Sequence, residues 1–311
     1  MNNQTMLVPL QQPIVFEIEG FDILPGSGPF FFLLALLFYM LVTCLDFVVF
    51  LLQTLSDPRL TSPMYFFLQN LSFVDLVYTT TTIPNMLAGF LMDQLTISIP
   101  GCFLQMFFFT QLAVTGRAIL TVMAYDRYLA VCNPLRYTAI MTRSVRMLLV
   151  TGAWGFGLLC TLPPTVLAFL RPYCGPNMVR HSWCDLSSVR TLACADTSID
   201  NVLSLSFAMV ALLTTGVLIL TSYFLIATSM YQMGVPERLK AFSTCAAHLT
   251  VVSISYISLP LKTYTNKSGV RIIVSVLYSA LTPFLNPMIY SLRNKESHHP
   301  CSVLLTAQRP S

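Results

Sequence analysis

Charged residues are scarce in this chain. Of its 311 residues only 10% are Asp, Glu, Lys or Arg, whereas 55% are hydrophobic, and the mean hydropathy is +0.70. Soluble domains carry about 25% charged residues, so this composition excludes an ordinary soluble protein. The formal net charge of +4 is small and the Lys and Arg residues are scattered, which argues against a nucleic-acid-binding surface.

The chain also lacks the side-chain groupings that a catalytic or metal centre needs. It has 4 histidines, and only His248 lies near an apolar run, so an intramembrane hydrolase has no evident nucleophile and base. Cys174, Cys184 and Cys194 lack the close CxxC pairs of a structural zinc site. No internal repeat typical of a secondary transporter is visible. We therefore expect no catalytic residue, no metal and no cofactor, and we rank the enzyme and transporter hypotheses low.

Long apolar runs dominate the chain. Seven of them are near the length of about 20 residues that crosses the hydrocarbon core of a bilayer. Backbone amides in lipid must be satisfied within the segment, so the runs are predicted to be helices, with kinks at Pro84, Pro164 and Pro283. The sequence predicts an all-α membrane protein built as a seven-transmembrane helix bundle. The runs are 30–52, 64–92, 102–125, 147–170, 202–227, 242–261 and 272–292.

The positions of Lys and Arg predict the orientation in the membrane. Residues 1–29 contain neither Lys nor Arg but carry three acidic residues, so the amino terminus is expected outside. Seven crossings then place the carboxyl terminus in the cytoplasm, although some outer loops also carry Arg or Lys. The expected parts are an extracellular segment 1–29, the helix bundle 30–293 and a cytoplasmic tail 294–311. No cleavable signal peptide is visible, so the first span is expected to act as the targeting signal.

The cysteines agree with this orientation. Cys102 is expected at the outer end of the third span, and Cys174, Cys184 and Cys194 crowd the next outer loop, so two disulfides are plausible there. The remaining five cysteines are expected to pack as reduced thiols. Asn3 begins the sequence Asn-Gln-Thr in the outer segment and is a candidate glycosylation site.

Several sequence blocks together carry a family resemblance. They are PMYFFLQNLSFVDL (63–76), MAYDRYLAVCNPLRY (123–137), SYFLI (222–226), KAFSTCAAHLTVV (240–252) and PFLNPMIYSLRN (283–294). With seven spans and the three-cysteine loop, they make the chain resemble the odorant receptors among rhodopsin-like G-protein-coupled receptors. Each block alone is weak evidence, but the ordered set is specific.

The resemblance implies a plasma-membrane receptor that binds a small, mostly apolar odorant between its helices. Such a receptor activates a heterotrimeric G-protein of the olfactory stimulatory type and raises cyclic AMP. Apolar walls would desolvate the ligand, and one hydroxyl would orient it. The candidate ligand-binding residues are Met106, Phe109, Thr110, Ala113, Val114, Phe207, Ala211, Tyr256, Leu259, Thr263 and Ser279.

The resemblance also implies a coupling site at the inner end of the bundle. Asp126 would hold Arg127 while the bundle is closed and release it when the helices separate. Asp75, deep in the second span, would pair with Asn286. The candidate coupling and activation residues are Asp126, Arg127, Tyr128, Tyr223, His248, Asn286, Pro287 and Tyr290.

For the cysteines, the family pattern favours a Cys102–Cys184 disulfide with Cys174–Cys194 as the second bond. Pairing of Cys102 with Cys194 stays open as the alternative. The bonds would pin the outer loop over the ligand cavity.

The chain departs from the family at three places. Asp46-Phe47 replaces the usual Gly-Asn pair of the first span, and we expect that Asp46 does not take the place of that Asn, because one step along a helix turns a side chain by about 100°. Gly116 replaces a usual Glu, and Pro300 disfavours a membrane-surface helix in the tail. Two alternatives therefore stay open, a non-olfactory chemosensory receptor and a diverged receptor with weak signalling.

Overall fold

The computed structural model describes residues 15–18, 28–55, 63–91 and 95–231, without 175, 176, 180 and 182, and part of 234–256, including the helical stretch 248–256. We call this stretch segment 248–256. The elements in chain order are β1 (Val15–Ile18), α1 (Gly28–Leu55), α2 (Pro63–Leu91), β2 (Leu95–Ser98), α3 (Ile99–Cys132), α4 (Tyr137–Ile140), α5 (Arg143–Phe169), β3 (Met178–Val179), α6 (Leu186–Arg190) and α7 (Ser198–Tyr231).

Polar caps begin two of the long helices. The Ser98 hydroxyl accepts a hydrogen bond from the backbone N–H of Gly101, and a proline occupies the first turn of α3. The Thr142 hydroxyl accepts from the N–H of Val145 at the start of α5. Each cap satisfies a backbone donor that the helix itself leaves without an acceptor. The apolar runs therefore begin as helices at defined residues.

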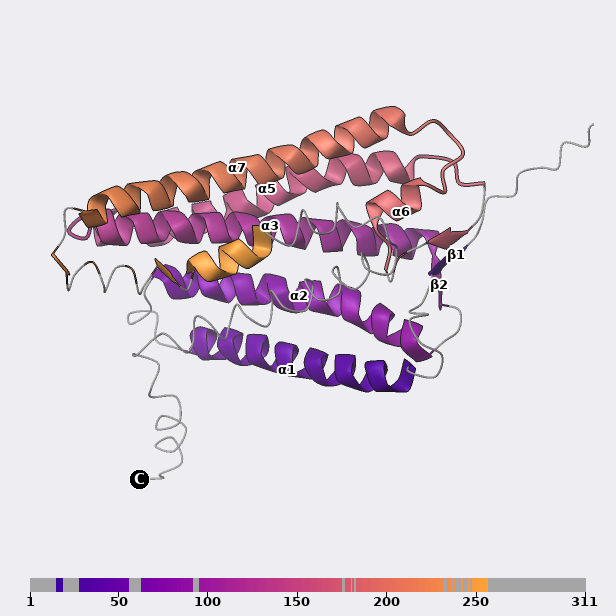
Figure 1. Cartoon of the computed structure of the whole chain (residues 1–311), viewed down its shortest axis with the longest axis horizontal. Coiled ribbons are helices and arrows are strands. Elements are labelled where there is room, and N and C mark those ends of the chain that lie inside the picture. Colours follow the sequence, from indigo (N-terminus) through magenta and orange to yellow (C-terminus); the bar gives the residue numbers. More distant parts are fainter. Residues whose placement is uncertain are drawn as a thin grey trace, which may run out of the picture.

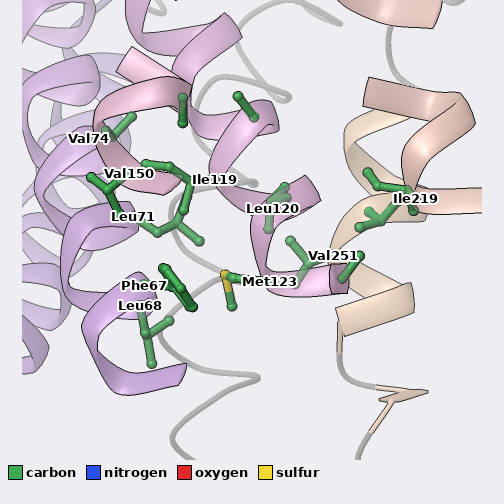
Figure 2. Packing of buried hydrophobic residues seen from close by; sticks show 14 of the residues in the cluster. Phe67, Leu68, Leu71, Val74, Ile119, Leu120, Met123, Val150, Ile219 and Val251 are labelled. Atoms are coloured by element: carbon green, nitrogen blue, oxygen red, sulfur yellow. The ribbon is translucent and has the colours of Figure 1, made fainter. Parts of the chain in front are cut away.

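The axes of the long helices α1, α2, α3, α5 and α7 are roughly parallel, and α3 lies at the centre (Figure 1). It packs against α2, α5 and α7, whereas α1 packs on α2. Apolar side chains from α2, α3, α5 and α7 meet in one cluster (Figure 2), in which Phe67 and Leu71 of α2 face Ile119 and Met123 of α3. Val251 extends this core to segment 248–256. Helix α3 therefore joins the elements that carry the candidate ligand-binding residues to those that carry the candidate coupling residues.

The bundle is apolar outside and partly polar inside. Leu220 and Phe224 of α7 are 72% and 68% exposed. The polar side chains of Thr79, Gln111 and Thr115 are buried between helices. Buried polar groups with apolar side chains facing out are the arrangement that a protein in lipid requires.

The helices agree with the first five predicted runs, but their ends differ. The third run was expected over 102–125, whereas α3 continues to Cys132, so Asp126-Arg127-Tyr128 lies inside the helix and not beyond its end. Within the described residues, three helices are long and apolar enough to cross a membrane, namely α3, α5 and α7. Pro84 and Pro164 lie inside α2 and α5. The run 272–292, with Pro283, lies outside the described residues.

A small sheet closes one end of the bundle, and sequence reasoning did not predict it. Its strand order is β2-β1-β3, with β1 antiparallel to β2 and parallel to β3. Phe16 and Ile18 of β1 are buried, and Phe16 packs edge-on against Tyr173. We call this end, which also holds α6 and the disulfides, the disulfide end, and the other the Asp126 end.

Candidate ligand and coupling sites

A disulfide fixes the loop before α6 onto the start of α3. Cys102 and Cys184 are bonded, with their Cα atoms 5.4 Å apart. The backbone N–H of Cys184 donates to Oε1 of Gln105 at 3.2 Å, and Nε2 of Gln105 donates to the carbonyl of Thr81 on α2 at 2.9 Å. The loop is therefore held by one covalent bond and by a buried amide that bridges two helices.

The second predicted disulfide, Cys174–Cys194, is also present, with a Cα–Cα distance of 5.8 Å. Both predicted pairings are confirmed, and the alternative Cys102–Cys194 is wrong. Tyr173 lies between the end of α5 and Cys174. Its hydroxyl donates a hydrogen bond to the carbonyl of Ala168 on α5 at 2.7 Å. Burial raises the pKa of Tyr173 to about 12, so the hydroxyl keeps the proton that it donates.

Two arginines join this loop region to the start of α7. Arg171 donates through Nε and Nη2 to both carboxylate oxygens of Asp200, at 2.7 and 2.8 Å. Arg190, which is buried, donates to Asn201 at 2.8 Å and to Ser204 at 2.6 Å. Bidentate pairing of this kind is directional as well as strong. Sequence reasoning treated Arg171 and Arg190 only as loop charges, because their partners become neighbours only in the folded chain.

The candidate ligand-binding residues do not all lie together. Those of α3 and α7 in the described part belong to different clusters. Val114 and Ala211 meet in one buried cluster, which also includes Cys160 of α5. Met106 lies in a different cluster, formed by the sheet and the segment between α5 and α6, which we call the disulfide loop. Phe207 is half-buried, one helical turn before Ala211. Cys160 packs here as a buried free thiol, as the sequence predicts. Leu259, Thr263 and Ser279 lie outside the described residues.

Phe109 is the candidate ligand residue with the most aromatic neighbours. Its ring stacks on Tyr78 of α2 with 5.2 Å between centroids, and it contacts Trp183 of the disulfide loop at 5.4 Å. Ala113, one helical turn further along α3, packs against the main core. These rings form an apolar wall where the loop meets α2 and α3.

The predicted orienting hydroxyls in the described part already have partners. Thr110 donates to the carbonyl of Met106 on its own helix at 2.8 Å. The hydroxyl of Tyr256 lies 2.6 Å from that of Thr215 on α7, so these two residues tie segment 248–256 to α7. Thr110 can still accept a hydrogen bond, but its proton is occupied.

At the Asp126 end, the partners of the triplet differ from expectation. The buried Asp126 accepts a hydrogen bond from the hydroxyl of Tyr137 on α4 at 2.8 Å. In the described part of the chain, no ion pair joins Asp126 to Arg127; the one ion pair found there is Arg171–Asp200. Successive side chains on a helix diverge by about 100°, so adjacency in sequence does not make a pair. Tyr128 packs against the main core.

His248 connects three helical parts beside this triplet. It is fully buried, with Nε2 3.0 Å from the carbonyl of Leu120 on α3 and Nδ1 2.7 Å from the hydroxyl of Tyr223 on α7. A carbonyl can only accept, so Nε2 carries the proton and Nδ1 accepts from Tyr223. Arg127 is near enough to act electrostatically on His248 and Tyr223. Asn286, Pro287 and Tyr290 lie outside the described residues.

The side chain of Asp46 points into the bundle, which corrects our expectation for the first span. Asp46 is fully buried, whereas Phe47 is 49% exposed. Its carboxyl is close enough to that of Asp75 for the two to repel each other, and neither oxygen of Asp46 has a hydrogen-bond partner among the described residues. Asp46 thus takes the inward place that the family pattern assigned to its neighbour. The family partner of Asp75, Asn286, is outside the described residues.

The loop-capped bundle with a polar network at its other end is the architecture of a helical membrane receptor. The olfactory receptor family model matches residues 34–308 of the chain. Olfactory receptor 6N1 of Homo sapiens is 43% identical over 286 residues, covering 90% of this chain and 91% of that protein. Olfactory receptor 10J4 of Homo sapiens is 40% identical over 286 residues, covering 90% and 92%. Olfactory receptor 5G9 of Mus musculus is 42% identical over 287 residues, covering 90% and 91%.

The chain belongs to the olfactory receptor family. It is a membrane receptor and not an enzyme, and the family implies the seven-transmembrane bundle that the sequence predicts.

Proposed function

We propose that this protein is an odorant receptor of the plasma membrane that binds a small, mostly apolar ligand toward its disulfide end. At its Asp126 end it activates a heterotrimeric G-protein of the olfactory stimulatory type, which raises cyclic AMP. The disulfide end faces outside and the Asp126 end faces the cytoplasm. The observation that carries the proposal is the family match over residues 34–308.

The two ends of α3 differ in structure, which supports ligand binding at one end and G-protein coupling at the other. At the disulfide end, a rigid loop lies over apolar rings and small side chains, which suits a ligand that is recognised mainly by desolvation. At the Asp126 end, His248 joins α3, α7 and segment 248–256 through two hydrogen bonds. A ligand that binds one arrangement of these helices better than another would shift their equilibrium and so alter the surface around Arg127.

The function is tested with a tagged receptor in cells that carry the olfactory G-protein. A panel of volatile alkenes, aldehydes, ketones, esters and alcohols should include compounds that raise cyclic AMP in a dose-dependent way. Arg127→Ala should abolish that response at matched surface expression. The control is Arg143→Ala, which removes an equal charge from an exposed position at the start of α5 and should leave the response in place. An unchanged response in Arg127→Ala contradicts the coupling role.

A receptor that reaches the surface but responds to no compound in the panel contradicts the odorant-receptor proposal. A diverged receptor with weak signalling would then be favoured, and Asp46 is the specific residue that supports it. A response to water-soluble compounds alone would favour a non-olfactory chemosensory receptor.

A further inference from the structure

We propose that the indole N–H of Trp183 is the hydrogen-bond donor that orients the ligand, and that the ligand class is a small apolar molecule with a neutral carbonyl oxygen, such as an aldehyde, a ketone or an ester. This inference rests on the proposed odorant-receptor function. It assigns a chemical class and a recognition residue to the site at the disulfide end.

Trp183 is buried but its donor is unused. The side chain is 2% exposed, and Nε1 has no hydrogen-bond acceptor among the described residues. Its ring lies against Phe109 at 5.4 Å and edge-on to His181 at 4.5 Å, so its surroundings are largely aromatic. Buried donors are almost always paired, so an unpaired one calls for an explanation, and the acceptor atom of a ligand is the one we propose here.

The loop is fixed, so Trp183 cannot easily turn its N–H to water. The next residue, Cys184, is bonded to Cys102, and its backbone N–H donates to Gln105. Gln105 is itself anchored to the carbonyl of Thr81 on α2. A donor held in place in this way loses little entropy when a ligand oxygen binds to it, which favours selectivity for that oxygen.

The nearby hydroxyls of Thr110 and Tyr256 and the side-chain amide of Gln105 do not compete for the role. Thr110 donates to Met106, and Tyr256 shares its hydroxyl contact with Thr215. Gln105 uses both its amide oxygen and its amide nitrogen. Among these groups, Trp183 is the donor with no acceptor in the described part of the chain.

The chemistry of an indole N–H then selects the ligand class. An indole only donates, and a carbonyl oxygen only accepts, so the two match without leaving a further polar group unsatisfied. A carboxylate would bring a full charge into surroundings in which the groups contacting Trp183 are aromatic, and that burial is unfavourable without a paired cation. An alkene fills the same volume but leaves the N–H without an acceptor.

The test compares matched ligands on the natural chain and on Trp183→Phe, which keeps an aromatic ring against Phe109 and removes the N–H. The probes are n-aldehydes, 2-ketones and methyl esters of six to ten carbons, each with the terminal alkene of equal length. On the natural chain, the carbonyl compounds should activate at concentrations about tenfold lower than the alkenes. In Trp183→Phe the carbonyl compounds should weaken about tenfold, and the alkenes should be unchanged. Surface expression is measured for each variant.

Trp154→Phe is the matched control, since it makes the same change in the other tryptophan, on α5, and should leave the carbonyl preference intact. The comparison on the natural chain needs no variant, so it decides even where Trp183→Phe fails to reach the surface. Activation by alkenes or alcohols with no carbonyl preference overturns this inference and leaves the receptor function standing. An equal loss for carbonyl compounds and alkenes in Trp183→Phe also overturns it. Activation by no compound overturns both proposals.

Discussion

At the scale of single residues, Asp46 is a buried side chain of the first helix whose polar atoms lack partners in the described part of the chain. It is fully buried on α1, neither oxygen has a partner among the described residues, and the carboxyl of Asp75 is near enough to repel its charge. An acid at the centre of a membrane helix costs about 2.5–3.5 kcal/mol on insertion scales. Two acids side by side cannot both be ionised without further cost.

Asp46→Asn should therefore raise surface expression, because the amide keeps a polar group at the buried position and cannot ionise. Flow cytometry on a tagged receptor measures the change, with a gain of several-fold expected. The control is Phe47→Asn, whose side chain is half exposed on the outer side of α1 and should bring no gain. Equal or lower expression of Asp46→Asn would show that the buried acid is already accommodated.

The position of Asp46 also shows what pattern matching misses at this scale. The family pattern assigns the inward polar side chain to the position of Phe47, yet in the structure Asp46 is the buried residue of the pair and Phe47 is half exposed. The hydrophobic sequence on both sides of Asp46 suits either rotation. A polar residue of a lipid-embedded helix turns toward the protein interior, and that preference decides the rotation.

At the scale of elements, α3 and α5 are held together by a buried amide network. Gln111 donates to the Thr115 hydroxyl at 3.3 Å and to the carbonyl of Trp154 at 3.2 Å, and it accepts from the Thr161 hydroxyl at 2.7 Å. Gly157 of α5 lies against this network. A Cβ at Gly157 would collide with the Thr115 hydroxyl and lie 3.1 Å from Nε2 of Gln111. The glycine is thus required for the close approach of the two helices.

Gly157→Ala should lower the stability of the receptor. Overpacking costs about 1–3 kcal/mol, which exceeds the gain of about 0.5–1 kcal/mol from replacing glycine in a helix. The thermal midpoint of the detergent-solubilised receptor measures the loss. Gly155→Ala is the control, because a Cβ there meets nothing within 4 Å, and its midpoint should stay equal or rise. Equal midpoints for the two variants would contradict this role of Gly157.

Element boundaries illustrate the limits of hydropathy. The sequence predicts the first five helices because lipid demands apolar runs of a certain length, and that demand is local. The end of α3 was predicted too early, since Asp126 and Arg127 interrupt the apolar run. Tyr137 of α4 satisfies Asp126 inside the fold, and the helix continues to Cys132. Strand β1 was missed because its pairing partners come from two distant segments.

At the scale of the whole molecule, two disulfides close the disulfide end over loops of different length. Cys102–Cys184 spans 82 residues and links α3 to the loop that carries Trp183. Cys174–Cys194 spans 20 residues within that loop region. The chain-entropy relation assigns about 4.5 kcal/mol to the longer loop and about 3.3 kcal/mol to the shorter. These are upper values, because the inserted helices restrict the unfolded chain as well.

Replacing both Cys102 and Cys184 by serine should therefore lower the thermal midpoint more than replacing both Cys174 and Cys194. The first double variant should also abolish the ligand response, since the loop over Phe109 loses its anchor. Cys44→Ser is the control, because this exposed thiol is free and its loss should change neither measurement. A larger loss from the Cys174 and Cys194 pair would contradict the ranking by loop length.

The sequence by itself determined the class of protein and the first five helical spans, and through the family pattern it favoured the two disulfide pairings. Hydropathy and length decide the spans through the local requirement that backbone groups in lipid be satisfied. The pairings followed from the ordered motifs of the family, and the structure contains both bonds. Neither inference needs the distance between two side chains.

Only the tertiary structure decided which polar groups meet. It turned Asp46 inward, paired Asp126 with Tyr137, joined His248 to Leu120 and Tyr223, and left the N–H of Trp183 buried without an acceptor among the described residues. Each of these depends on the rotation of a helix about its axis and on the register of one helix against another. A rotation of about 100° or a one-residue shift changes every such partner while the hydropathy of the sequence stays the same, so hydropathy does not specify them.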